Sequence, residues 1–389
     1  MANSNLTAAK KAKNDEFYTQ YIDIQKEINA YLEYDKDVFR GKIVLLPCDD
    51  PEWSNFTKFF AQNFEQLGLK KLISTSHAVD SKHYKKGYQV TMFEESAPQY
   101  DKKKTTKHGK IFTLSHDKSG DGKIDVDDLE WDYLEGDGDF HSKEVIKLRD
   151  EADIIITNPP FSLFRGFLAW IVEAKKQYVI IGNMNAITYK EVFPLIKENK
   201  MWLGATGNGT DMVFAVPEGT EVDEKDKLKA ERLGYVGDYT RLGNSCWFTT
   251  IDHGKRHKPL NLMTMADNER FNKKLQRKAA YDRYDNYDAI EIPFTDAIPN
   301  NYDEIMGVPI SFLDKYSPEQ FEIVGMCENE DLYKLKSKVY STVECKQAYL
   351  DKFEKKGTYD LNASGVVIRA GLREKVYQRI LIKHKKVSI

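Results

Sequence analysis

The sequence predicts an α/β fold in which a mostly parallel sheet is flanked by helices. Short apolar or β-branched runs end at turn or polar residues, a pattern typical of buried strands. Between these runs lie segments whose apolar residues recur at every third and fourth position, the period of an amphipathic helix. Because such strands and helices alternate along the chain, parallel strands with helices on both faces are the favoured arrangement.

Each expected element follows from one of these patterns. The strands are expected at residues 42–47, 71–76, 153–157, 178–182 and 246–251. The helices are expected at residues 55–66, 161–175 and 189–200. Beyond about Asp252 the alternation ends and the sequence becomes irregular, so a second domain is expected there. We therefore predict one domain over residues 1–260 and another over residues 261–389.

Composition argues against several classes of protein. No run in the 389 residues approaches the roughly 20 apolar residues of a membrane-spanning helix, and the N-terminus lacks the apolar stretch of a secretory signal. A cytoplasmic protein with no membrane partner is expected. The cysteines lack paired spacing, which favours reduced thiols over a disulfide framework and predicts no metal site; they are Cys48, Cys246, Cys327 and Cys345.

The overall charge gives no sign of a nucleic-acid binder. With 58 Lys and Arg against 61 Asp and Glu, the net charge is -3. The net charge hides two segments of opposite sign, because acidic residues are concentrated between residues 121 and 139 and basic residues between residues 369 and 386. Since phosphate contacts depend on where charges lie, the sum does not exclude DNA.

The most informative residues are Asn158, Pro159, Pro160 and Phe161, which stand between an expected strand and an expected helix. The two prolines fix φ and lack backbone N–H groups, so they hold the chain rigid and extended. The side-chain oxygen of Asn158 and the carbonyl of Pro159 could both accept hydrogen bonds from one exocyclic amino group. Phe161 would then stack on the planar group that bears this amine. The alternative is a plain strand-to-helix turn that Asn158 caps.

The same tetrad resembles the catalytic motif of S-adenosylmethionine-dependent amino-methyltransferases acting on adenine N6, and more loosely of those acting on guanine N2 or glutamine amides. Further segments narrow the resemblance: KNDEFYTQ, GDGDFHSKE, TNPPFSLFR, YVIIGNMNAITYKEVFPLIK, RLGNSCWFT and MGVPISFLDKYSPEQFEIVG. Together they resemble EcoRI-type adenine-specific DNA methyltransferases over nearly the whole chain. This resemblance implies a Rossmann-like methyltransferase fold with a C-terminal target-recognition region.

The resemblance also implies where S-adenosylmethionine binds. The Phe-Tyr-Thr segment looks like the one that closes over the methionine part of the cofactor, and the loop after the first strand corresponds to the first cofactor loop. The implied cofactor-binding residues are Phe17, Tyr18, Thr19, Pro47, Cys48, Asp49, Asp50, Ser54, Asn55, Asp139, Phe140 and Asn158. The loop lacks the usual glycine. The second strand offers Ser76 and His77 where an acid usually holds the ribose, and Asp80 comes only later. The alternative for Asp139 is a solvated turn carboxylate.

The activity implied is sequence-specific transfer of a methyl group to the N6 atom of an adenine flipped out of double-stranded DNA. We expect a monomer in a restriction–modification or phage setting, and the sequence leaves open a cognate restriction endonuclease acting separately. Basic residues near the C-terminus would contact DNA phosphates; they are Arg369, Arg373, Lys375, Arg379 and Lys383. The alternative for this tail is a solvated helix or hairpin.

Two other functions stay open at this point. A guanine N2 or a glutamine amide also presents a planar NH₂ group, so an RNA or protein methyltransferase could use the same tetrad. A non-enzymatic nucleic-acid binder is the third class. Separately, residues 117–128 match the spacing of a calcium loop, but their strand-like flanks favour a β-hairpin with a Gly-Asp-Gly turn.

Overall fold

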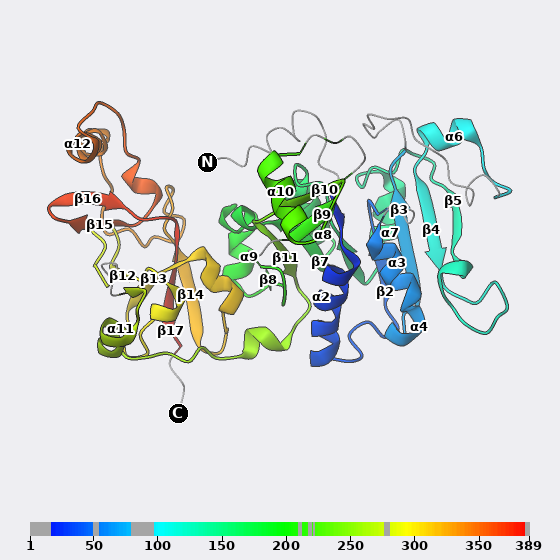
Figure 1. The fold of residues 1–389 in the computed structure, drawn as a ribbon, viewed down its shortest axis with the longest axis horizontal. Helices are drawn as coiled ribbons and strands as arrows, with labels where there is room; N and C mark the ends of the chain where they lie inside the picture. Colours follow the sequence, from blue (N-terminus) through cyan, green and yellow to red (C-terminus); the bar gives the residue numbers. More distant parts are fainter. Residues whose placement is uncertain are drawn as a thin grey trace. The chain divides into compact units, whose positions relative to one another are not determined.

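The computed structural model describes residues 17–49, 54–78, 97–208, 212–216, 220, 222–275 and 281–385. The chain divides into two compact units (Figure 1). The first comprises Met1–Leu195 with Lys200–Gly254, and the second comprises Ile196–Asn199 with Lys255–Ile389. No helix among the described residues has the length and apolar character needed to cross a membrane.

The first unit is built on an eight-stranded sheet with the order β5-β4-β3-β2-β6-β7-β11-β8. Its strands are β2 (Ile43–Leu46), β3 (Lys71–Ser76), β4 (Lys110–Leu114), β5 (Glu130–Tyr133), β6 (Ile154–Thr157), β7 (Gln177–Asn183), β8 (Trp202–Leu203) and β11 (Ser245–Thr249). The central strands β3, β2, β6 and β7 are parallel, whereas the pairs on both flanks are antiparallel. The α/β prediction is confirmed, with a sheet that is mixed because antiparallel strands extend the parallel centre.

Helices cover both faces of this sheet. Those of the first unit are α2 (Tyr21–Tyr34), α3 (Asn55–Gln62), α4 (Phe64–Leu67), α6 (Lys102–Lys107), α7 (Lys143–Glu151), α8 (Phe164–Glu173) and α10 (Glu224–Arg232). A further helix, α9 (Phe193–Lys197), begins in this unit and ends in the second. Ile24 of α2 and Phe56 of α3 share a core with Ile181 of β7. The neighbouring Gly182 faces the other way, and a side chain there would collide with the Phe164 ring of α8. The parallel centre is therefore buried on both sides.

The expected helices differ from the observed ones at their ends. The segment predicted at 55–66 is broken at Asn63 into α3 and α4. The segment predicted at 189–200 is helical only in α9, after the short 3-10 helix η3 (Met184–Thr188). The segment predicted at 161–175 starts later, at Phe164, because residues 161–163 form a turn in which the Leu163 amide donates to the Pro160 carbonyl.

A small antiparallel sheet in the first unit has the order β1-β9-β10. Its strands are β1 (Tyr18–Thr19), β9 (Met212–Ala215) and β10 (Tyr239–Leu242). Thr19 and Thr240 both lie opposite Phe214, on its two sides. This sheet brings the N-terminal motif beside strands that come about 200 residues later in the chain.

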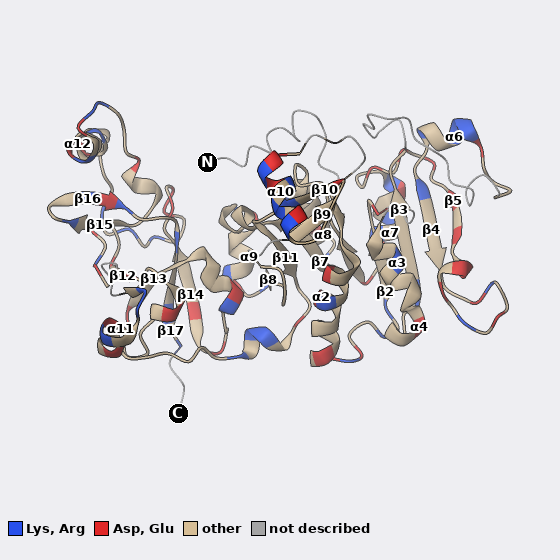
Figure 2. Cartoon of the chain, in the orientation of Figure 1, with Lys and Arg blue, Asp and Glu red and all other residues tan. Residues whose placement is uncertain are grey.

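The second unit contains a four-stranded sheet with the order β12-β13-β17-β14 and a two-stranded hairpin. Its helices and strands are α11 (Met265–Phe271), β12 (Ala289–Glu291), β13 (Ile305–Pro309), β14 (Phe321–Met326), α12 (Thr342–Phe353), β15 (Val366–Arg369), β16 (Leu372–Lys375) and β17 (Arg379–His384). The 3-10 helices η6 (Thr295–Ala297), η7 (Ile310–Lys315) and η8 (Leu361–Ala363) also belong to it, and η4 (Gly254–His257) begins at the last residue of the first unit. The basic tail thus forms a hairpin strand and a central sheet strand. Figure 2 shows Lys and Arg interspersed with acids in both units.

Candidate active site

Asn158, Pro159, Pro160 and Phe161 follow directly on β6, at the carboxyl end of the parallel strands. The chain leaves β2 for β3 on one side, whereas β6 leads to β7 on the other. Ligands of open α/β sheets bind where strand order reverses in this way. The tetrad therefore lies at the position in the sheet where a ligand crevice is expected.

The Asn158 amide is fixed by the N-terminal segment. Its Nδ2 atom donates a hydrogen bond to the backbone carbonyl of Phe17. Its Oδ1 atom is buried and accepts no hydrogen bond. Buried polar atoms are nearly always paired, so an unpartnered acceptor at this place calls for an external donor. The amide does not cap the following helix, since α8 begins only at Phe164 and its N-cap is Leu163 without a side-chain bond.

Three phenylalanine rings cluster at the tetrad and the segment that binds its amide. Phe161 stacks on Phe17 with ring centroids 5.6 Å apart and an interplanar angle of 28°. Phe214 of β9 meets both rings edge-on, at 6.0 Å from Phe17 and 6.5 Å from Phe161. The site thus combines a polar acceptor with flat apolar faces, as a planar amine-bearing ring would require.

The strand β1 extends the site toward β2. Asn55, the first residue of α3, donates from Nδ2 to the backbone carbonyl of Thr19 at 2.8 Å. Thr19 is 3% exposed, and its hydroxyl has no hydrogen-bond partner. Tyr18 is half-buried and, as the adjacent strand residue, faces the opposite side. The segment Phe17 to Thr19, predicted to close over the cofactor, is therefore hydrogen-bonded to the segment after β2 that is predicted to bind the cofactor.

Asp49 organises the loop after β2. The residue is 6% exposed, and its carboxylate accepts hydrogen bonds from Ser54 Oγ at 2.7 Å and from Thr157 Oγ1. Ser54 also caps α3 by accepting from the Phe56 amide. The Thr157 hydroxyl lies 2.7 Å from the Pro47 carbonyl as well. Through these bonds Asp49 joins β2, β6 and α3; Asp50 lies outside the described residues.

Cys48 takes the place of the missing glycine. Its φ is +67°, the left-handed conformation that glycine usually supplies. A residue with a side chain is strained there by about 1 kcal/mol. Its Sγ atom lies 3.8 Å from His77 Nε2, just beyond the end of β3. The loop therefore adopts this left-handed conformation without glycine, and Asp80 lies outside the described residues.

Asp139 and Phe140 have different surroundings. The loop that carries Asp139 packs against the end of β3, because a side chain at Gly138 would lie 2.4 Å from the Ser76 carbonyl. The Asp139 side chain is about half exposed and accepts from the amide and ring of His141. Phe140 is buried against Phe167 of α8, with ring centroids 5.2 Å apart. Asp139 remains accessible to a ligand, whereas Phe140 anchors its loop.

Sequence reasoning did not identify Phe214 or Glu27. Phe214 lies in a short strand with no motif of its own. Glu27 of α2 is fully buried and accepts hydrogen bonds from Tyr31, Ala205 and Thr206. Burial raises the pKa of its carboxyl, and these bonds lower it in part. A glutamate in an apolar helix face is the one signal that could have identified Glu27.

The basic tail forms internal contacts. Arg379 is 8% exposed and holds Glu291 through two guanidinium nitrogens, so it has no free face for a phosphate. The other side chains are more exposed: Arg369 pairs with Asp282 and Glu374, Arg373 lies 3.9 Å from Asp285, Lys375 lies 6.0 Å from the Tyr359 ring centroid, and Lys383 lies 3.3 Å from Glu322.

The calcium-like segment forms the loop of a hairpin between β4 and β5. The prediction of a strand directly after the Gly-Asp-Gly turn, at residues 123–126, is wrong, since Val126–Asp128 is a 3-10 helix and β5 starts at Glu130. The Asp128 carboxylate accepts from the amides of Lys118, Ser119 and Asp125. Within the described part of the chain, no three His, Cys, Asp or Glu residues are placed to hold a metal ion.

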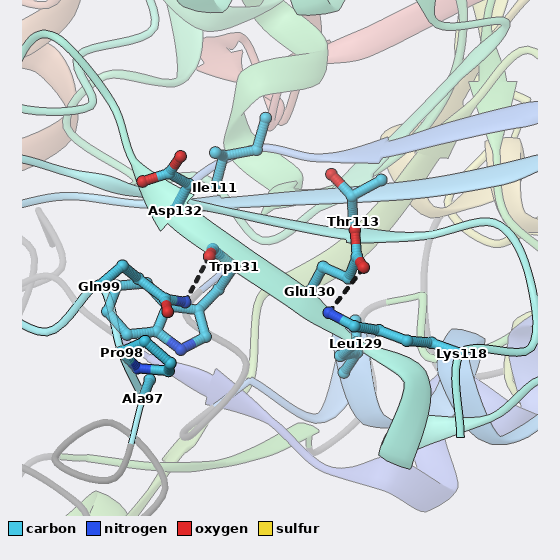
Figure 3. A pocket seen from close by; sticks show the side chains of 10 residues that line it. All are labelled: Ala97, Pro98, Gln99, Ile111, Thr113, Lys118, Leu129, Glu130, Trp131 and Asp132. Atoms are coloured by element: carbon cyan, nitrogen blue, oxygen red, sulfur yellow. Dashed lines mark hydrogen bonds and ion pairs between the residues drawn. The ribbon is translucent and has the colours of Figure 1, made fainter. Parts of the chain in front are cut away.

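A pocket of about 640 Å³ lies along β5 (Figure 3). Gln99 donates to the Trp131 carbonyl on one side, and Lys118 pairs with Glu130 on the other. The strand β5 is four strands from β6 in the sheet, or about 19 Å at ordinary strand spacing. This pocket is therefore separate from the site around Asn158.

Comparison with known proteins agrees with this geometry. Residues 5–385 match the family model described as "Adenine-specific methyltransferase EcoRI". The Type II methyltransferase M.EcoRI of Escherichia coli is 42% identical over 85% of this chain and 91% of its own. M.MpnI of Mycoplasma pneumoniae is 33% identical over 82% and 85%, and M.MgeORF184P of Mycoplasma genitalium is 31% identical over 97% and 98%. No solved structure matches the chain. The chain belongs to the EcoRI family of adenine-specific methyltransferases.

Proposed function

We propose that this methyltransferase transfers a methyl group from S-adenosylmethionine to the N6 atom of an adenine that is flipped out of double-stranded DNA. The adenine-specific family supports the reaction, and the relatives named Type II methyltransferases support a DNA substrate in a restriction–modification setting. Base flipping follows because N6 of a stacked, paired adenine cannot reach a donor inside the protein.

The unpartnered Oδ1 atom of Asn158 carries this proposal. Its amide is oriented by Phe17, so the oxygen is preorganised to accept one N6 hydrogen while the Pro159 carbonyl accepts the other. Two acceptors on one amino group draw its nitrogen toward tetrahedral geometry and free the lone pair. Phe161 supplies the stacking face. No base need act before attack, because the amine becomes acidic only as it gains the methyl group.

The residues on the β2 side fit S-adenosylmethionine. When bound, this group supplies a methyl on a positively charged sulfur. Thr19 offers a buried hydroxyl with no partner, the turn at Cys48 brings backbone close, and Asp139 presents an accessible carboxylate to an amine. His77, which follows β3, is our candidate for the ribose hydroxyls. Asp49 acts through the loop that it holds.

We propose that the second unit recognises DNA and that the protein acts as a monomer, independently of any cognate endonuclease. Lys383, Lys375, Arg373 and Arg369 are the candidates for phosphate contacts because their side chains are partly exposed. We leave Arg379 out of this set, since its guanidinium is committed to a buried carboxylate.

Asn158→Ala tests the proposal. The matched control is Asn63→Ala, which also removes an Nδ2 bond to a backbone carbonyl, that of Phe59 at 2.8 Å. We expect Asn158→Ala to lower the rate of labelled methyl transfer to duplex DNA by about 10²- to 10³-fold, the usual effect of removing a preorganised polar group. Asn63→Ala should keep the rate.

Duplex DNA, RNA and protein are assayed in parallel with the native chain. Transfer to RNA or protein in preference to DNA would refute the proposed substrate, and a near-normal rate in Asn158→Ala would refute the role of Asn158. Sequencing methylated adenines in DNA from cells that express the chain then identifies the recognition site.

A further inference from the structure

Thr240 of β10 projects from the face of the small sheet that packs toward β6 and β7. It lies opposite Phe214, as Thr19 does on the other side, so these three side chains project from the same face of the small sheet. Two residues on, Leu242 projects from that face as well and belongs to the core that contains Ile181 of β7. Arg241 between them projects from the opposite face, where it approaches Asp226 of α10.

The hydroxyl of Thr240 is buried without a partner. The residue is 1% exposed, and its Oγ1 atom neither donates nor accepts a hydrogen bond. A threonine at such a place could be a valine at no loss of contacts, since the two have the same shape. Leaving a hydroxyl unpaired in the interior costs stability, so its presence indicates a bond made in another state of the protein.

Thr19, Phe214 and Thr240 form a row across the small sheet, and the position of Thr240 in this row indicates which ligand it contacts. Thr19, at the β2 end of the row, is tied to Asn55 of the cofactor loop. Phe214, in the middle, contacts Phe161 after β6. The strand β10 turns into β11, whose Ser245 pairs with Asn183 at the end of β7. The row therefore runs from the β2 side, where the cofactor residues lie, past β6 toward β7.

We propose that Thr240 Oγ1 donates a hydrogen bond to a ring nitrogen of the flipped target adenine. The inference rests on the proposed function, which places the cofactor toward β2 and the base beyond Asn158. An adenine whose N6 meets Asn158 and whose ring stacks on Phe161 has ring nitrogens that only accept hydrogen bonds. A threonine hydroxyl, which donates one hydrogen, complements such an acceptor.

Thr240→Val removes the hydroxyl and keeps the shape. We expect kcat/KM for DNA to fall about tenfold, the ordinary effect of one hydrogen bond, while the Kd for S-adenosylmethionine measured by calorimetry stays unchanged. The unfolding midpoint should stay the same or rise, because no bond is lost in the free protein. The matched control is Thr249→Val, which removes a buried hydroxyl that donates to the Tyr178 carbonyl and accepts from the Ile251 amide. That control should unfold more easily and keep its kcat/KM.

Substrate analogues identify the contact. Duplexes that carry 1-deaza-, 3-deaza- or 7-deazaadenine at the target each lack one ring acceptor. One of them should lower kcat/KM of the native protein by the same factor as the substitution and lower that of Thr240→Val no further. Equal losses in both proteins for all three analogues, or an unchanged kcat/KM in Thr240→Val, would overturn the inference. A native protein that methylates no DNA would instead refute the proposed function.

Discussion

Replacing Asp49 with asparagine or with alanine should have very different effects. The Asp49 carboxylate accepts from Ser54 Oγ on one oxygen and from Thr157 Oγ1 on the other. The Thr157 hydroxyl has a single hydrogen and lies equally within reach of the Pro47 carbonyl. An asparagine oxygen would keep the Ser54 bond, and its NH₂ group would donate to Thr157, which would then donate to Pro47.

Alanine offers neither bond. It leaves the buried Ser54 hydroxyl without its acceptor, whereas Thr157 can still donate to the Pro47 carbonyl, so Asp49→Ala should lower the free energy of unfolding by about 2 kcal/mol. Asp49→Asn should cost about 1 kcal/mol or less, because each group keeps a partner. Urea unfolding followed by circular dichroism measures both values. Ser54→Ala, which removes one of the bonds and the helix cap, should lie between them.

Calorimetry with S-adenosylmethionine separates positioning from direct contact. If Asp49 acts only through its loop, Asp49→Asn should keep the native affinity. Equal destabilisation by asparagine and alanine would refute the hydrogen-bond assignment, because it would show that the negative charge itself is required. Native stability with lost affinity in Asp49→Asn would show that the carboxylate touches the cofactor.

Three further predictions concern other parts of the chain. Burial raises the pKa of Glu27 above 4.5, so the stability from its bound proton is present below that pH and lost as pH rises through the folded pKa. Glu27→Gln should therefore flatten the decline of urea midpoints as pH rises above about 4.5; parallel curves would contradict this. Gly138→Ala should destabilise by about 1–3 kcal/mol, because φ is +89° and the added carbon meets backbone, whereas Gly136→Ala, with open space, should not. Arg379→Met should destabilise by about 3–5 kcal/mol by unpairing a buried carboxylate. Lys383→Met should leave stability unchanged and reduce the slope of log binding constant against log salt concentration for DNA by about one unit. A stability loss in Lys383→Met together with a reduced slope in Arg379→Met would refute the assignment of Arg379 to stability and of Lys383 to DNA.

The parallel centre of the fold could be predicted because buried strands carry their pattern locally. The runs before Pro47 and Asn158 contain only apolar and β-branched residues and end at a turn or polar residue. The antiparallel direction of β11 could not be predicted, because the local sequence of a strand indicates neither its partner nor its direction relative to that partner. Helix ends were missed where a single residue, such as Asn63, interrupts an apolar period that continues beyond it.

For the site, a motif predicted the place of Asn158, and the packing around it came only from the structure. The carbonyl that orients its amide belongs to Phe17, which lies 141 residues earlier in the chain. Phe214 comes beside Phe17 through the pairing of β9 with β1, and Thr240 is placed by the pairing of β10 with β9. The pairing of strands that are distant in the sequence cannot be read from either segment alone. A site residue that belongs to no motif can therefore be identified only from the structure.

The turn at Cys48 has a practical consequence for chemistry in solution. Cys246, Cys327 and Cys345 are buried, whereas Cys48 is partly exposed. A thiol reagent such as a maleimide should therefore label this one loop first, because only accessible thiolates react quickly. The rate of that labelling, with and without added small molecules, would report occupancy beside β2 independently of any catalytic turnover.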